Sequence, residues 1–175
     1  MNHPLSGRAA IAGIGQTEFS KASGRTELQL ACEAVKAALA DAGLSPADVD
    51  GLVTFTLDSS EELEVARNLG ITDLSLFSRV PYGGGAAAGT VLQAAMAIAT
   101  GVAEVVVVYR ALNDRSGLRF GSFGGSITEL PLWLSWYAPF GLLTPASWVA
   151  LQAHRYMHAY GVTNADFAPI SVVDR

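Results

Sequence analysis

The residues from Val80 to Gly101, VPYGGGAAAGTVLQAAMAIATG, could do chemistry without offering a reactive side chain. Small residues separate a strand-like run from an apolar helical pattern, so they predict a strand-to-helix corner. Backbone N–H groups at such a helix start can hold an anion or a polarised carbonyl oxygen. The corner lacks the Gly-Lys-Ser/Thr of a phosphate loop and the serine of a nucleophile elbow. The alternative interpretation is a tight corner where crowding excludes side chains.

Reactive side chains elsewhere are sparse. Cys32 falls inside a helical apolar stripe, which favours core packing over a nucleophile. His154 and His158 share a helix face, but Arg155 stands where a zinc protease motif has glutamate, and no third ligand is evident. We therefore expect no metal site.

Two clusters are candidates for binding. Arg110, Arg115 and Arg119 follow a predicted strand, where they either meet phosphate groups or remain in solvent and salt bridges. Aromatic side chains gather in an irregular segment and indicate core or interface packing, or a wall for a flat lipid or sterol: Trp133, Trp136, Tyr137 and Phe140.

Composition narrows the class of protein. Of 175 residues, 50% are hydrophobic and 15% charged, with a net charge of −5. No apolar run reaches the roughly 20 residues of a membrane helix, so a buried subunit interface explains the apolarity better than a membrane does. The net negative charge and the lack of a basic stripe argue against a nucleic-acid partner. A single cysteine, and an N-terminus without a signal-peptide pattern, favour the cytoplasm.

The elements that position the corner alternate between strand and helix. The predicted strands cover 9–15, 50–57, 71–80 and 103–109, and the predicted helices cover 26–42, 60–69 and 86–100. Thr26 opens the first helix, with Gln29 completing a capping box, and Gly43 ends it. This alternation predicts an α/β fold with a mostly parallel sheet and helices on both faces.

The domain prediction is one domain over residues 1–175. Its βα units cover 9–110, a Gly- and aromatic-rich excursion covers 111–143, and helices cover 144–175. Thr144 and Pro145 suit the start of a helix that Gly161 ends. A last helix, capped by Thr163, still carries its apolar face at the final residue, which predicts an incomplete chain.

Four segments together resemble a known family: AAIAGIGQTEFSK, LADAGLSPADVDGLVTFT, AIATGVAEVVVVYRALNDRSG and TPASWVALQAHRYMHAYGVTNADF. Their order and spacing are similar to the N-terminal half of a thiolase-superfamily protein in the lipid-transfer, or sterol-carrier-protein thiolase, branch. The resemblance implies αβαβα layers built from two similar halves and acyl-CoA substrates. It also implies a homodimer that pairs through the strand at 71–80.

The corner departs from the thiolase pattern. In thiolases it carries the acyl-accepting cysteine in a Cys-small-Ser/Thr-Gly motif. Counting back from GVAE places that cysteine at Gly84, and the four motif positions read Gly84, Gly85, Ala86 and Ala87. Without a thiolate the acyl group has no covalent attachment point, so the chain is not expected to be a Cys-dependent thiolase.

The corner YGGGAA and the following VYRALNDRSG are similar to a cysteine-less actinobacterial branch, the steroid side-chain aldolases. That resemblance implies retro-aldol cleavage of a β-hydroxy acyl-CoA into a ketosteroid and a short acyl-CoA. It makes Tyr82, Gly83, Gly84 and Gly85 the candidate substrate-binding residues. The catalytic acid and base remain unassigned, because the family's groups, tyrosines, belong to the second half of the fold.

The resemblance further implies a small OB-fold, zinc-ribbon acyl-CoA-binding protein as partner. No cofactor is expected, since the sequence shows no motif for the use of oxygen, flavin or nicotinamide. Two alternatives stay open. One is a non-catalytic acyl-CoA- or lipid-binding scaffold subunit, and the other is a thiolase with an unidentified nucleophile.

Overall fold

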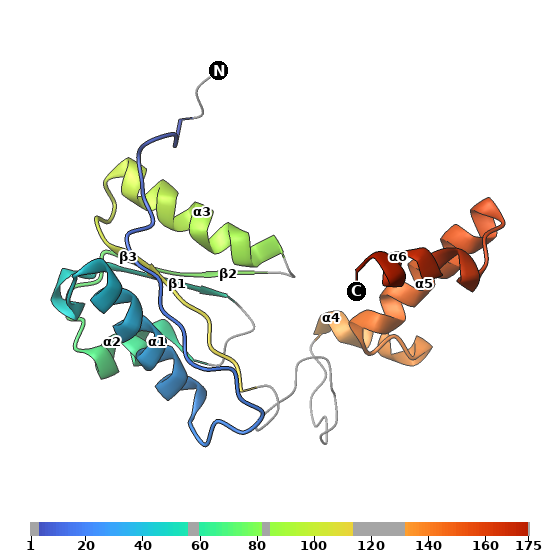
Figure 1. Ribbon diagram of the computed structural model, residues 1–175, viewed down its shortest axis with the longest axis horizontal. Coiled ribbons are helices and arrows are strands. Elements are labelled where there is room, and N and C mark those ends of the chain that lie inside the picture. Colours follow the sequence, from blue (N-terminus) through green and yellow to red (C-terminus); the bar gives the residue numbers. More distant parts are fainter. Residues whose placement is uncertain (1–3, 56–59, 82–84, 114–131, 175) are drawn as a thin grey trace. The chain divides into compact units, whose positions relative to one another are not determined.

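The computed structural model of the chain describes residues 4–55, 60–81, 85–113 and 132–174. Figure 1 shows the helices and strands, which are, in chain order, α1 (Glu27–Ala42), η1 (Pro46–Asp48), β1 (Gly51–Phe55), α2 (Glu62–Leu69), β2 (Leu76–Val80), α3 (Gly85–Thr100), β3 (Val106–Val108), α4 (Leu132–Ser135), η2 (Ala138–Phe140), α5 (Pro145–Tyr160), η3 (Asn164–Phe167) and α6 (Ala168–Val173). The chain divides into two compact units, Met1–Leu118 and Arg119–Arg175.

The first unit is built on a parallel sheet with strand order β2-β1-β3. α3 covers one face of the sheet, while α1 and α2 cover the other (Figure 1). Parallel strands need helical crossovers, and these crossovers bury both faces. The predicted fold class, α/β with a parallel sheet and helices on both faces, is confirmed.

α1 begins and ends where the sequence predicted. The Thr26 hydroxyl accepts a hydrogen bond from the Gln29 N–H at 3.1 Å, and Gly43 ends the helix in the left-handed region at φ 69°. The capping box is only half formed, because the Gln29 side-chain amide donates to Glu33 at 3.0 Å. The Gln29 side chain therefore points along the helix, and its oxygen does not accept from the Thr26 N–H as a capping box requires.

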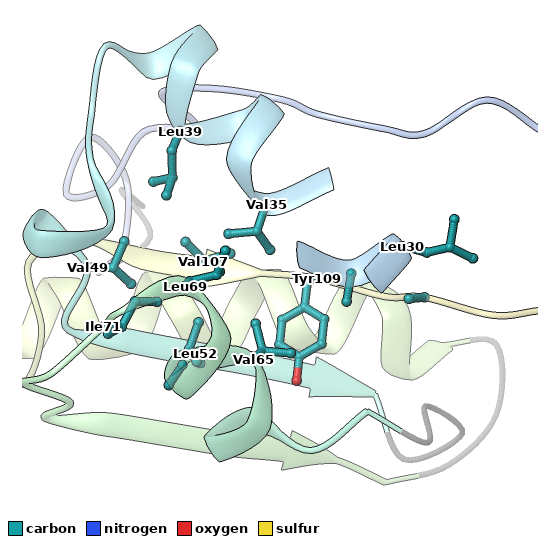
Figure 2. Packing of buried hydrophobic residues seen from close by; sticks show 13 residues of the cluster. Leu30, Val35, Leu39, Val49, Leu52, Val65, Leu69, Ile71, Val107 and Tyr109 are labelled. Carbon is teal, nitrogen blue, oxygen red and sulfur yellow. The ribbon is translucent and has the colours of Figure 1, made fainter. Parts of the chain in front are cut away.

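The hydrophobic core of this unit lies between α1, α2 and the sheet (Figure 2). Its labelled members are Leu30, Val35, Leu39, Val49, Leu52, Val65, Leu69, Ile71, Val107 and Tyr109. Leu52 in β1 and Val65 in α2 are both 0% exposed. Complete burial of β-branched and leucine side chains from both layers fixes the helices against the sheet.

The predicted strand at 9–15 is wrong. This segment forms no strand and lies against α1, with the Ile14 N–H donating to the Asp41 carboxylate at 2.9 Å. Gly13 allows the close approach, because a Cβ there would lie 2.8 Å from the Ala42 nitrogen. β1 and β3 pair directly with each other, so the segment does not lie between them. Ile11 and Ile14 are each 77% exposed as a result.

Other predicted elements exist but are shorter. β2 begins at Leu76 rather than at 71, and β3 covers only Val106–Val108. α2 begins at Glu62, after the non-helical Glu61. The last predicted helix is a 3₁₀ turn, η3, followed by α6. Element ends fray where few ladder or helix bonds hold them.

The second unit consists of short helices around α5. The Thr144 hydroxyl accepts from the Ser147 N–H at 3.3 Å, Pro145 is the first helical residue and Gly161 ends the helix, as predicted. Aromatic side chains pack in pairs, with ring centroids 5.5 Å apart for Tyr137–Trp148, 4.7 Å for Tyr156–Tyr160 and 6.1 Å for Tyr156–Phe167. In the part of the chain that the structure describes, no helix is both long and apolar enough to cross a bilayer.

Candidate active site at the carboxyl edge of the sheet

The three strands end at one edge of the sheet. β1 ends at Phe55, which pairs with Val80, the last residue of β2, and β3 ends close by at Val108. α3 starts at the same edge, just after β2 (Figure 1). Ligands of open parallel sheets bind outside the carboxyl ends of the strands, so this edge is the candidate site.

Of the substrate-binding residues predicted from the sequence, the structure describes one at this edge. Tyr82, Gly83 and Gly84 lie outside the described residues. Gly85 is described as the first residue of α3, and a Cβ on it would meet no atom within 4 Å. α3 has no acidic residue in its first turn, so no side-chain carboxylate of that turn offsets the positive end of the helix dipole.

An ion pair ties the end of β2 to the start of α2. Arg79 donates from Nε to one Glu62 oxygen at 3.2 Å and from Nη2 to the other at 3.1 Å. Glu62 is buried, and its hydrogen bond raises the pKa of Arg79. Both charges are therefore largely neutralised within the protein, and the pair serves to position the strand end.

A second contact adds the end of β3 to the same network. The Ser60 carbonyl oxygen accepts from Arg79 Nη2 at 3.4 Å and from the Tyr109 hydroxyl at 3.2 Å. The Thr54 hydroxyl, in β1, donates to the Tyr109 carbonyl oxygen at 3.1 Å. Side chains from all three strand ends are thus linked through two backbone carbonyl oxygens at this edge.

Arg110 lies at this edge on the α3 face of the sheet, opposite the face that carries Tyr109. Its guanidinium carbon is 4.9 Å from the centre of the Phe55 ring, and it has no carboxylate partner among the described residues. Phe55 is 4% exposed, so the ring offers a fixed platform for the cation. Of the arginine cluster predicted from the sequence, Arg115 and Arg119 lie outside the described residues.

Cys32 does not belong to the candidate site. It lies in α1 and packs against the core on the α1–α2 face, whereas the corner leads into α3 on the other face (Figure 1). Burial raises the pKa of its thiol. A protonated thiol separated from the corner by the sheet cannot take the place of a thiolase nucleophile.

Two other features are a histidine pair and a cavity. His154 and His158 are exposed on α5, and the described residues contain no group of three or more potential metal ligands. A cavity of about 560 Å³ opens beside β3, lined by residues 9–15 and by parts of α1, α3 and β3. Its lining includes Arg110 but neither Pro81 nor Gly85, which flank the corner.

The sequence did not predict the hydrogen bonds that connect residues at the carboxyl edge of the sheet. Arg79, Glu62 and Tyr109 come from separate elements, and only their contacts make them part of one network. One signal was available: alternation along β3 places neighbouring residues on opposite faces, which separates Tyr109 from Arg110. Nothing in the sequence pattern indicates that Arg110 rests on Phe55.

Comparisons with known proteins identify the relatives of the chain. No protein-family model matches it. Over 98% of its length the chain is 65% identical to a protein of Thermomonospora curvata named "Steroid side-chain-cleaving aldolase". The chain is a homologue of steroid side-chain aldolases. This confirms the resemblance to the steroid side-chain aldolases that was predicted from the sequence.

Two further matches agree with the aldolase assignment of the relatives. A Mycobacterium tuberculosis protein, "17-hydroxy-3-oxo-4-pregnene-20-carboxyl-CoA lyase", is 59% identical over 98% of the chain. A solved structure, "Ltp2-ChsH2(DUF35) aldolase", is 65% identical with a TM-score of 0.81 and covers 99% of the chain. The chain spans about 45% of the length of these aldolase and lyase relatives and 44% of the solved chain.

Proposed function

We propose that the protein cleaves a β-hydroxy acyl-CoA of the steroid side-chain type by a retro-aldol reaction, releasing a ketosteroid and a short acyl-CoA. The observation that carries the proposal is the 65% identity, along nearly the whole chain, to a steroid side-chain-cleaving aldolase. The lyase relative, at 59% identity, supports the same class of C–C bond cleavage.

The chemistry of the corner agrees with this reaction. A retro-aldol step needs a base for the β-hydroxyl group and stabilisation of the thioester enolate, but no covalent acyl-enzyme. A glycine at position 84 leaves space for the branched carbon that carries the hydroxyl. Tyr82, Gly83, Gly84 and Gly85 border the reacting carbon in this proposal, and the backbone N–H groups at the start of α3 face its oxygen.

We propose that these residues are one half of an αβαβα fold, with the acid and base groups in the other half. α3 supports this, because it is apolar all round and its outward side chains Val91, Leu92 and Met96 are 43–50% exposed. Helices that are apolar on every side are normally buried. The relatives, more than twice as long, have enough chain to cover it.

The proposed assembly includes a partner protein and a cytoplasmic location. The solved relative is named as an aldolase with a ChsH2(DUF35) component, which supports a small acyl-CoA-binding partner of the OB-fold, zinc-ribbon type. The low cysteine content favours the cytoplasm. That residues 1–175 form a single domain also remains part of the proposal.

A homodimer through β2 is a further part of the proposal. β2 is an outer strand of the sheet, and Phe77 in it is 60% exposed, although an unpaired strand edge is usually protected. We expect Phe77→Glu to raise the dimer dissociation constant at least 10-fold, because the charge would be buried at the contact. Sedimentation over a dilution series measures this.

The matched control for the dimer is Phe19→Glu, since Phe19 is 94% exposed outside the sheet and should leave the dissociation constant unchanged. Dilution of the wild-type protein to a stable folded monomer at nanomolar concentration would show that the β2 dimer is wrong.

The proposed activity is tested with the complete protein, purified alone and with its partner. It is incubated with a β-hydroxy steroid acyl-CoA and, separately, with a β-ketoacyl-CoA plus free CoA. We expect a ketosteroid and a short acyl-CoA from the first substrate only. Mass spectrometry identifies the products. Turnover of neither substrate, with tight acyl-CoA binding, would favour the scaffold alternative. Turnover of the second alone would favour a thiolase.

A further inference from the structure

We propose that the Arg110 guanidinium binds the thioester oxygen of the acyl-CoA, the atom on which negative charge develops as the C–C bond breaks. This inference rests on the proposed function, and it assigns a substrate-contacting role to a residue in the described part of the chain. Position, charge and chemistry support it separately.

The position follows from the alternation of side chains in β3. Val107 and Tyr109 belong to the core on the α1–α2 face, so Val108 and Arg110 point to the α3 face. Phe55 lies on that face too, since Thr54 and Leu52 alternate with Val53 and Phe55 along β1. The contact of Arg110 with the Phe55 ring at 4.9 Å agrees with this geometry.

That face leads directly to the corner. Phe55 is in register with Val80, the last residue of β2 before Pro81. α3 packs over the same place, because a Cβ on Gly89 would lie 3.3 Å from the Val80 side chain. Arg110 is therefore held at the carboxyl edge of the sheet, across β1 from the end of β2 that leads into the corner, on the side of the sheet where α3 begins.

The charge of Arg110 is available to a ligand. Arg25 and Arg79 are both paired with glutamates, whereas Arg110 has no carboxylate partner within the described ranges. Its contact with a buried ring holds the guanidinium in place without neutralising its charge. The side chain therefore loses little conformational freedom when an anion binds. The start of α3, which has no acidic residue in its first turn, adds positive potential nearby.

The proposed reaction places negative charge where this cation lies. A base removes the proton of the β-hydroxyl, the C–O bond becomes a carbonyl and the Cα–Cβ bond breaks. Its electron pair moves through Cα onto the thioester oxygen, giving an enolate, and protonation at Cα yields the short acyl-CoA. Arg110 stays protonated throughout and stabilises the enolate more than the neutral thioester, which lowers the barrier.

The experiment compares Arg110→Gln, Arg110→Lys and the control Arg67→Gln in the complete protein with its partner. Arg67 is exposed on α2, so its substitution removes the same charge away from the edge. We expect Arg110→Gln to lower kcat about 100-fold with a smaller change in KM, as for loss of one oxyanion donor. Arg110→Lys should retain part of the rate, and Arg67→Gln should match wild type. Thermal unfolding checks that each variant is folded.

Two substrates distinguish the thioester oxygen from the CoA phosphates as the group that Arg110 binds. One is the CoA thioester, and the other is a pantetheine thioester, which lacks the nucleotide phosphates. An equal loss of kcat with both substrates supports the thioester oxygen. A rise in KM confined to the CoA substrate would show that Arg110 meets a phosphate and would overturn the inference. Equal rates for Arg110→Gln and Arg67→Gln would overturn it while the proposed function stands, whereas absent wild-type turnover would overturn the proposed function and the inference with it.

Discussion

Replacing Gly84 with valine is expected to lower kcat/KM for the β-hydroxy steroid acyl-CoA by about 100-fold or more. The proposed reaction brings a tertiary carbon, with its hydroxyl and ring substituents, against the position where thiolases carry their cysteine. Three added carbon atoms would occupy that space and displace the reacting bond from the catalytic groups. A displacement of about 1 Å is enough to cost roughly 100-fold in rate.

Steady-state kinetics of the complete protein measure this effect, and Ala40→Val serves as the control for added bulk. Ala40 is exposed on α1, on the other side of the sheet from the corner, so its enlargement should leave kcat/KM unchanged. A Gly84→Val protein with wild-type kcat/KM would show that the corner does not border the reacting carbon, and the substrate-binding role of residues 82–85 would be wrong.

The second large effect concerns stability. Gly15→Ala is expected to lower the free energy of unfolding by about 3 kcal/mol, because overpacking against rigid neighbours costs up to about that amount. A Cβ at Gly15 would lie far inside van der Waals contact with the Ala34 carbonyl oxygen and the Ala38 nitrogen. These are backbone atoms of α1, which cannot rotate away. Urea denaturation followed by circular dichroism measures the change.

Ala10→Val provides the comparison, because Ala10 is exposed on the same segment and a larger side chain there should change stability by less than about 0.5 kcal/mol. If Gly15→Ala unfolds at the same urea concentration as wild type, the close approach of residues 9–15 to α1 does not exist in solution. Hydrogen exchange at the Ile14 amide, which is bonded to Asp41, reports the same contact independently.

Local signals predicted helix ends well because their causes are local. Thr26 and Gly43 bound α1, and Thr144 and Gly161 bound α5, since a hydroxyl cap or a left-handed glycine acts within one turn of the residue itself. The parallel sheet was predictable for a similar reason. Alternating strand and helix patterns leave few ways to bury both kinds of apolar surface.

The failed strand at 9–15 shows the limit of such signals. AAIAGIG has the composition of a buried strand, yet its glycines allow an equally close approach to a helix. Whether such a segment pairs with a strand or packs on α1 depends on contacts between distant parts of the chain. β1 and β3 already pair with each other, and that pairing joins residues more than 50 positions apart in the chain.

The sequence by itself determined the class of fold, the relatives, and the absence of a cysteine at position 84, because residue types and their order carry this information directly. Only the tertiary structure decided which charges are neutralised and which remain available. Arg79 is neutralised by Glu62, whereas Arg110 has no carboxylate partner among the described residues, although both arginines lie at strand ends. The reason is physical: an ion pair or a ring contact depends on distances between separate elements, and those distances exist only once the sheet and its helices have packed.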